Sequence, residues 1–375
     1  MHRHRAFDAQ AINVTIERAL SSAGLDTGTG PMKQVTETIR RALRGGRDDT
    51  LPTQRAFDRI DAGAEVVRAE TVIPDPGTRR PDTGGEFTSH SFSNDAGTRT
   101  YKLYVPGSYG RSLDAVAMVV MLHGCTQSPD DFAAGTRMNE LAEQHGFLVV
   151  YPAQPVGANG SKCWNWFQPV HQRRDTGEAS LIAGITREVA AHHRIDRSRV
   201  FVAGLSAGAA MAIVVATAYP DVFAAAGAHS GLAYGSARDV ASALAAMGSG
   251  DAPPLSSATL ATAAGAARRL PIITFHGDRD NTVNVRNSSR IVLQALAGRA
   301  LRRDDTDGAL GGRAYRCTRY VDATGLTVIE QWTLRGAGHA WSGGSAAGSF
   351  TDPGGPDASG EMVRFFLSQS HGEST

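Results

Sequence analysis

The segment VFVAGLSAG, residues 200–208, decides the fold class of this 375-residue chain. Its first half is a continuous apolar run, which is typical of a strand buried on both faces. Gly204, Ser206 and Gly208 then form a G-x-S-x-G pattern, and the apolar helical stretch 209–220 follows directly. A strand that turns this sharply into a helix needs small residues around the serine, because side chains there would clash. The turn lifts the serine hydroxyl above the sheet and leaves the next N–H at a helix N-terminus.

Apolar runs of strand length lie on both sides of this segment. Runs of the same form occupy residues 116–124, 147–154, 223–231, 271–278 and 327–339, and 101–106 alternates like an early antiparallel strand. Helical patterns separate them at residues 130–146, 180–194, 285–298 and 359–370. The alternation predicts an α/β fold with a doubly wound, mostly parallel sheet and helices on both faces. Ligands bind at the carboxyl ends of strands in such sheets, so functional residues are expected there.

The first 85 residues differ from the rest. Apolar residues four apart predict short amphipathic helices near residues 12–20 and 35–43, and the Pro/Gly-rich stretch 74–87 predicts a linker. We therefore expect an N-terminal extension, residues 1–85, and a catalytic domain, residues 86–375. Within that domain the Ala-rich stretch 237–268 is a possible cap insertion.

Charge and composition exclude several function classes. The 38 basic and 37 acidic residues give a net charge of +1, which predicts no nucleic-acid partner. No apolar run of about 18 residues occurs, so no membrane span is predicted. No signal-peptide pattern is visible, which predicts a cytoplasmic protein, with an extracellular location as the alternative. Three cysteines without CxxC spacing predict neither a disulfide scaffold nor a zinc site.

Two further strand ends carry the partners that a nucleophilic serine needs. Asp278 and Asp280 follow the strand at 271–277, and His339 follows the last strand. The chain order serine, acid, histidine is the one found in hydrolases that carry this serine turn. Asp278 directly follows a glycine and can bond locally, as turn aspartates do. We therefore predict a catalytic triad of Ser206, His339 and one of these two aspartates.

The loop after residue 122 is the candidate for the oxyanion hole. The backbone N–H groups of Cys125 and Ala207 are the predicted donors to a developing oxyanion. His123 is a candidate substrate-binding residue, although a histidine before a glycine commonly braces its loop. Cys125 and Cys163 fall on loops at the same edge of the sheet, and both a disulfide and two free thiols remain open.

Tryptophans gather on the strand-end loops. Trp164, Trp166 and Trp341 are candidate substrate-binding residues that would form an apolar wall beside the nucleophile. The same pattern suits side chains that close the edge of the core, and both interpretations remain open.

Taken together, these segments resemble the polyhydroxybutyrate (PHB) depolymerase family of esterases, which includes feruloyl and acetylxylan esterases. The resemblance covers about residues 100–370 and is carried by HGCTQ (123–127), CWNWF (163–167), GLSAG (204–208), HG (276–277) with Asp280 and Val283, GHAWSGG (338–344) and DPGGPDA (352–358). It implies an α/β-hydrolase fold with the serine as nucleophile, and it implies that Asp280 rather than Asp278 is the triad acid. It implies no metal or organic cofactor.

The chain departs from many members of this family in one respect. No export signal or polymer-binding module is visible, which favours soluble or intracellular esters over crystalline polymer as substrates. The expected function is that of a serine carboxylesterase acting on small or polymeric hydroxyalkanoate esters. A feruloyl or acetylxylan esterase is the alternative, and a non-catalytic binding protein on a hydrolase fold is the alternative of another class. The sequence does not indicate the oligomeric state.

Overall fold

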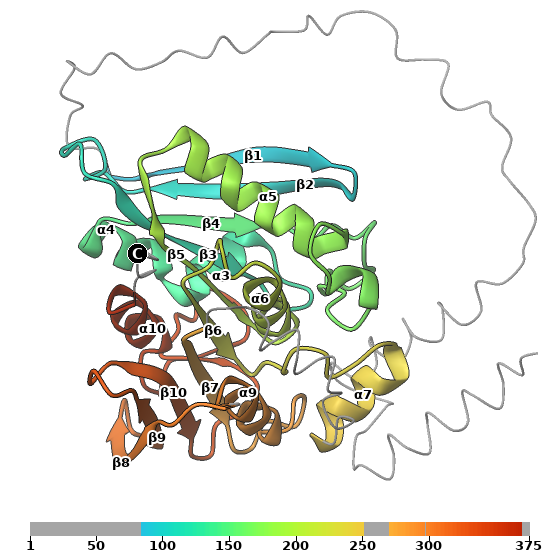
Figure 1. Ribbon diagram of the computed structural model, residues 1–375, viewed down its shortest axis with the longest axis vertical. Coiled ribbons are helices and arrows are strands. Elements are labelled where there is room, and N and C mark those ends of the chain that lie inside the picture. The colour runs from blue at the N-terminus through green and yellow to red at the C-terminus, as the bar shows by residue number, and fades with distance from the viewer. Residues whose placement is uncertain (1–83, 251–269, 297, 370–375) are drawn as a thin grey trace, which may run out of the picture. The chain divides into compact units, whose positions relative to one another are not determined.

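A ten-stranded sheet organises the protein in the structure, a computed structural model that describes residues 84–250, 270–296 and 298–369. The strand order is β1-β2-β4-β3-β5-β6-β7-β10-β9-β8, which runs from top to bottom in Figure 1. The six central strands pair in parallel: β4 (Leu148–Pro152), β3 (Val116–Leu122), β5 (Ile195–Leu205), β6 (Ala225–His229), β7 (Ile272–Gly277) and β10 (Thr327–Leu334). Each overlaps a predicted run, although β5 begins before residue 200, so the predicted parallel sheet is confirmed.

Antiparallel strands extend the sheet at both edges. They are β1 (Glu86–Asn94), β2 (Gly97–Val105), β9 (Arg313–Val321) and β8 (Arg302–Leu310). Only β2 was expected from its alternating pattern. The sequence analysis missed β1, β8 and β9, because their exposed faces are polar and they contain no continuous apolar run.

Helices cover both faces of the sheet. One face holds α5 (Gly177–His192), α6 (Ala207–Ala218) and α9 (Arg286–Leu296), and the other holds α3 (Pro129–Thr136), α4 (Met138–His145) and α10 (Ala358–Leu367). Consecutive residues of β3 point alternately into the two cores, Val120 into the first and Val119 and Met121 into the second. This two-sided burial explains the continuous apolar runs.

The predicted helix over residues 130–146 is wrong as a single element. Arg137 adopts a left-handed backbone with φ of 54° and divides the segment into α3 and α4. Its N–H donates to the carbonyl of Ala133 and closes α3, while its guanidinium donates to the carbonyl of Gly343 at 3.0 Å. A tertiary contact therefore holds the break, which local helical spacing does not reveal.

The remaining elements lie around the loops of the sheet. They are η1 (Pro169–His171), α7 (Val240–Ser249), β11 (Trp341–Ser342) and β12 (Thr351–Asp352). The predicted extension at residues 1–85 lies almost entirely outside the described residues. Residues 251–268 of the predicted cap also lie outside them. In the part of that cap which is described, residues 240–249 form α7, whose N-terminus is closed by a capping box at Asp239.

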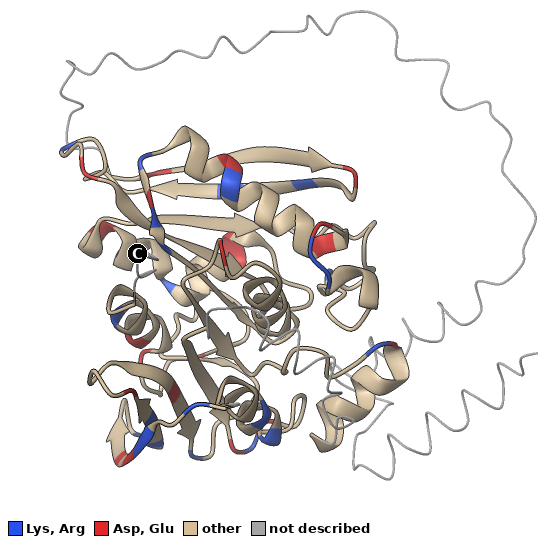
Figure 2. Ribbon diagram, viewed as in Figure 1, with Lys and Arg blue, Asp and Glu red and all other residues tan. Residues whose placement is uncertain are grey.

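Charged side chains of both signs are interspersed over the described elements (Figure 2). On the β8–β9 hairpin, for example, Arg316 forms an ion pair with Asp307 at 2.8 Å. Among the described residues, no helix has the length and apolar character needed to cross a bilayer.

Candidate active site

Ser206 occupies the tight turn between β5 and α6. Its backbone angles, φ 57° and ψ −119°, lie in a region that residues with side chains rarely adopt. The Ser206 N–H donates to the carbonyl of His229 at the end of β6, at 2.9 Å. Surrounding contacts therefore hold the strained backbone, an arrangement typical of a functional residue.

Close packing explains the two glycines of the turn. A Cβ on Gly204 would lie 2.5 Å from the carbonyl carbon of Gly208 and 2.6 Å from the carbonyl oxygen of Leu122. A Cβ on Gly208 would overlap that same Leu122 oxygen and lie 2.5 Å from the carbonyl oxygen of His123. The turn thus packs directly on the end of β3, which brings Ser206 beside the predicted oxyanion loop.

Asp280 and His339 are in direct contact. His339 Nδ1 lies 2.7 Å from Asp280 Oδ2, and Asp280 Oδ1 accepts hydrogen bonds from the N–H groups of Thr282 and Val283 at 2.9 and 2.8 Å. Burial raises the pKa of Asp280, but hydrogen bonds from His276 and His339 outweigh it and hold this pKa well below its ordinary value. The carboxyl is therefore ionised at neutral pH and can stabilise a charged imidazole.

The neighbouring aspartate has a different role in the structure. Asp278 Oδ1 accepts a hydrogen bond from the N–H of Gly336 at 2.6 Å, and Asp278 Oδ2 lies 3.6 Å from the Arg335 guanidinium. These contacts hold the loop after β7 against the loop that leads to His339. The geometry therefore favours Asp280 over Asp278 as the partner of the histidine.

The structure brings Asp280 and His339 together and places Ser206 at the end of a nearby strand. Within the described part of the chain, His339 is not hydrogen-bonded to Ser206. Such bonds are often long before substrate binds. His339 is the more exposed partner of the pair, with 13 % of its side chain open to solvent, whereas the side chain of Asp280 is fully buried. A ligand can thus reach the His339 side chain but not that of Asp280.

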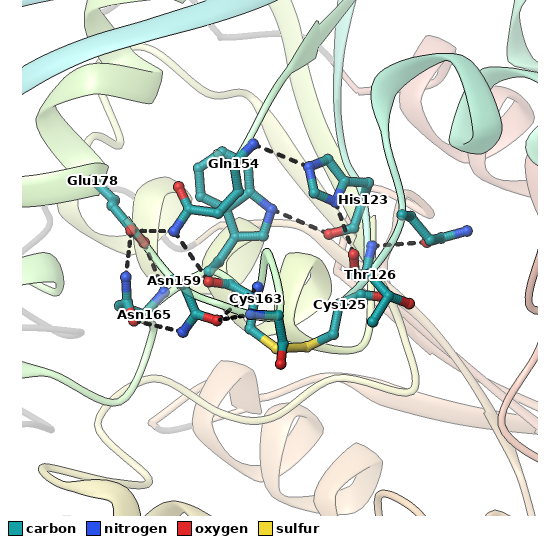
Figure 3. Close-up of a disulfide and its surroundings, with 12 residues drawn as sticks. His123, Cys125, Thr126, Gln154, Asn159, Cys163, Asn165 and Glu178 are labelled. Carbon is teal, nitrogen blue, oxygen red and sulfur yellow. Dashed lines mark hydrogen bonds between the residues drawn. A yellow bond between two sulfur atoms is a disulfide. The ribbon is translucent and has the colours of Figure 1, made fainter. Parts of the chain in front are cut away.

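A disulfide joins the predicted oxyanion loop to the tryptophan-bearing loop (Figure 3). Cys125 and Cys163 are bonded, with their Cα atoms 4.2 Å apart, which settles the question that the sequence left open. Beside the bridge, the N–H of Thr126 donates to the carbonyl of Ser161 at 2.7 Å. The N–H of Gly124 donates to the side chain of Gln127 at 2.8 Å.

The other half of the bridge is anchored to a buried carboxylate. Asn159 Oδ1 accepts from the N–H of Cys163 at 3.2 Å, and Asn159 Nδ2 donates to Asn165 Oδ1 at 3.0 Å. Asn165 in turn donates from its backbone and its side chain to Glu178, both at 2.7 Å. Figure 3 shows how these residues form one network beside the bridge. The network gives the oxyanion loop a rigid support.

The two predicted oxyanion donors are available. Among the described residues, neither the N–H of Cys125 nor that of Ala207 is hydrogen-bonded. Ala207 is the first residue of α6, where an N–H has no partner within the helix. Both amides can therefore donate to a developing negative charge.

His123 braces the loop and is buried away from substrate. The N–H of Gln154 donates to its Nε2 at 3.1 Å, so Nδ1 carries the proton and donates to the carbonyl of Gly124 at 2.7 Å. Burial lowers the pKa of His123 to about 4, which keeps the ring neutral. Its candidacy as a substrate-binding residue is therefore corrected to a supporting role.

The tryptophans are also inside the protein. Trp164 donates to the carbonyl of His123, and Trp341 donates to Ser359 Oγ and packs edge-on against Phe132. Both are fully buried, and Trp166 is 5 % exposed. The burial of all three favours indoles that close the edge of the core over an apolar wall, and the N–H groups of Trp164 and Trp341 find buried acceptors there.

Two residues near the site escaped the sequence analysis. Phe350 is 44 % exposed and has a φ of 52°, and its carbonyl accepts from the N–H of Trp341, two residues after His339, at 2.7 Å. The neighbouring Ser349 accepts from Gln127 of the oxyanion loop. The second missed residue is His229, at the end of β6. No sequence motif marks either residue.

Over the described ranges, no group of three or more His, Cys, Asp and Glu side chains is placed to bind a metal ion. The groups that the structure brings to this edge of the sheet are the side chains of Ser206, His339 and Asp280 and the backbone amides of Cys125 and Ala207.

The chain is similar to known esterases. A family model described as "Esterase PHB depolymerase" matches residues 99–319. Poly(3-hydroxyalkanoate) depolymerase C of Paucimonas lemoignei is 38% identical over 227 residues, 59% of this chain and 54% of that protein. Feruloyl esterase B of Neurospora crassa is 37% identical over 143 residues, 38% of this chain and 47% of that protein. The chain thus spans about half the length of these relatives.

A solved structure shows the same fold. Acetyl xylan esterase from Aspergillus awamori superposes with a TM-score of 0.58 at 21% identity, covering 75% of this chain and 99% of that one. At this identity the likeness concerns the fold alone. It confirms the α/β-hydrolase fold that the resemblance implied.

Proposed function

Because the chain belongs to the PHB depolymerase family of esterases, we propose that it is a serine carboxylic-ester hydrolase with Ser206, His339 and Asp280 as its triad. The observation that carries the proposal is the contact between His339 Nδ1 and Asp280 Oδ2 beside the strained turn of Ser206. Ser206 and Asp280 lie within the matched residues 99–319, and the contact with Asp280 supports His339 as the third member.

In the proposed mechanism, His339 Nε2 takes the proton of the Ser206 hydroxyl as its oxygen attacks an ester carbonyl. Asp280 keeps the histidine proton on Nδ1 and stabilises the imidazolium. The amides of Cys125 and Ala207 donate to the oxyanion, each contributing about 3 kcal/mol in sites of this kind. His339 then gives the proton to the leaving alcohol, and water hydrolyses the acyl-enzyme by the same steps.

The activity is tested with p-nitrophenyl acetate, butyrate and octanoate. We expect hydrolysis by the wild type and a loss of at least about a thousandfold in kcat/KM for Ser206→Ala. Ser180→Ala, on α5, is the matched control and should keep wild-type rates. Equal rates in wild type and Ser206→Ala would overturn the assignment. An inactive wild type that fails to react with a fluorophosphonate would favour the non-catalytic alternative.

For the substrate we propose short hydroxyalkanoate esters or their polymers, as the name of the relative from Paucimonas lemoignei suggests. Feruloyl or acetyl esters are the second candidate, which the names of other relatives support. Product analysis on 3-hydroxybutyrate oligomers, methyl ferulate and acetylated xylan separates them. Inactivity on the oligomers with activity on either of the others would replace the first candidate by the second.

We propose that the protein works in an oxidising compartment. The Cys125–Cys163 disulfide supports the extracellular alternative over the cytoplasmic expectation, because such bonds are rare where glutathione keeps thiols reduced. Thiol titration of protein isolated from its native cells under alkylating conditions is the test. One free thiol per chain, that of Cys317, is expected, and three would contradict the proposal.

A further inference from the structure

His229 lies between the two strands that lead to the catalytic loops. It is the last residue of β6, and β6 separates β5, which ends before Ser206, from β7, which ends before Asp280. The side chain is fully buried, so it does not touch substrate. The proposed mechanism gives it no chemical role, and its contacts must account for its place at the site.

Two hydrogen bonds connect His229 to both sides of the site. Its backbone carbonyl accepts from the N–H of Ser206 at 2.9 Å. Its ring Nε2 accepts from the N–H of Ser342 at 3.1 Å, three residues after His339. Because a backbone N–H can only donate, Nε2 carries no proton. The ring proton is on Nδ1, which lies 3.2 Å from Ser230 Oγ.

Ring stacking fixes the orientation of the imidazole. The His229 ring stacks on Trp341 with a centroid distance of 5.3 Å and on Phe275 of β7 with 5.9 Å. Trp341 is held from elsewhere by Phe132 and by its bond to Ser359. The segment directly after His339 is thus packed on one imidazole whose backbone binds the nucleophile turn.

The ring stays neutral in the folded protein. Burial, followed by the nearby His276 and His339, lowers the pKa of His229 to about 3, and Asp280 opposes this effect. A neutral ring keeps one bare nitrogen as acceptor, which the Ser342 N–H requires. Protonation would replace this hydrogen bond by a repulsion between two donors.

We propose that His229 is a positioning residue that sets the distance between Ser206 and the base His339. The proposal rests on the proposed function. Misplacement of a catalytic group by about 1 Å can cost about a hundredfold in rate. A ring that only fills space would allow any side chain of similar volume. A positioning ring needs an acceptor at the place of Nε2.

Two substitutions separate these roles. His229→Phe keeps the stacking volume but leaves the Ser342 N–H without an acceptor. His229→Gln restores an acceptor, because its Oε1 lies the same number of bonds from Cβ as Nε2. Val189→Ala, a buried change on α5, is the control for lost stability. All variants are assayed with p-nitrophenyl butyrate and labelled with a fluorophosphonate well below their melting temperatures.

We expect His229→Phe to lower kcat and the labelling rate of Ser206 by about a hundredfold, with KM within about threefold of wild type. The kcat of His229→Gln should be at least about tenfold higher than that of His229→Phe, and Val189→Ala should keep wild-type kcat. A folded His229→Phe with wild-type kcat overturns the proposal, as does a His229→Gln that recovers nothing. A wild type that neither turns over nor labels overturns the proposed function instead, and this role with it.

Discussion

Replacing Asp280 by asparagine tests the triad at a single atom. In the structure, Asp280 Oδ1 accepts two backbone hydrogen bonds, from Thr282 and Val283, and Oδ2 faces His339 Nδ1. An asparagine carries an oxygen in one of these places and an NH₂ group in the other. Two N–H donors cannot face an NH₂ group, so the amide oxygen stays at the Oδ1 position. The NH₂ group must then face His339.

This forced orientation gives the size of the effect. An NH₂ donor opposite His339 Nδ1 requires that nitrogen to accept, which moves the ring proton to Nε2. The base is then protonated at the atom that must take the proton of Ser206. A wrong tautomer of this kind lowers kcat by about 10⁴, which corresponds to about 5.5 kcal/mol of transition-state stabilisation. KM should change little, because Asp280 is buried away from substrate.

The assay is the initial rate on p-nitrophenyl butyrate, with active sites counted by fluorophosphonate. Asp278→Asn is the matched control, because it can keep its acceptor for the Gly336 N–H and does not touch His339. We expect it to stay within about tenfold of wild type. The reasoning is refuted if Asp280→Asn retains kcat within tenfold. A large loss of kcat in Asp278→Asn together with a retained kcat in Asp280→Asn would move the acid role to Asp278.

Reduction of the Cys125–Cys163 disulfide, which spans 38 residues, should lower the free energy of unfolding by about 4 kcal/mol. It should also lower kcat, because the Cys125 amide is then no longer held in place by the bond to Cys163. Denaturant titrations and rates with and without a phosphine reductant check this, and an unchanged kcat would separate the bridge from the oxyanion hole. Between pH 7 and 5, the wild type should lose about 2 kcal/mol more unfolding free energy than His229→Gln, because the pKa of His229 is about 3 in the fold and about 6.5 in the unfolded chain. The unfolded chain therefore binds the proton first as the pH falls, and parallel stability curves would contradict this. Phe350→Ala should raise KM for octanoate esters by about tenfold and leave acetate hydrolysis unchanged, since Phe350 is exposed and its backbone bonds to the segment that follows His339. Equal effects on both esters would remove it as an acyl contact.

The central strands were predictable because burial on both faces leaves continuous apolar runs. The carboxyl ends of parallel strands meet at one edge, so the residues that follow the strands of Asp280 and His339 could be expected to converge, whereas the choice of Asp280 over Asp278 needed the family resemblance. The edge strands were not predictable in this way. In β8, RRDDTDGAL, the charged residues pair locally or across the hairpin, as Asp307 does with Arg316. Such pairing depends on the partner strand, which no local pattern specifies.

The tryptophans and the cysteines were left open for a related reason. Whether Trp164 lines a pocket or closes the core depends on an acceptor for its indole N–H, and that acceptor is the carbonyl of His123, 41 residues away. The disulfide likewise depends on a separation of 4.2 Å between two Cα atoms that are 38 residues apart in sequence. Both are facts about how loops from different strands approach one another. Spacing along the chain does not contain them.

The sequence alone does not show which histidine acts as the catalytic base, whereas the contacts of each ring in the structure distinguish them. His123, His229 and His276 all stand at the ends of apolar runs, like candidates for the catalytic base. Each is buried, and each ring bonds to a backbone group of another loop: the N–H of Gln154, the N–H of Ser342 and the carbonyl of Val283. For His123 and His229, a neutral imidazole suits this use because it offers one donor and one acceptor on a rigid ring. His339 differs in that it reaches solvent and has an ionised partner on its inner nitrogen, which are the two properties that a base needs.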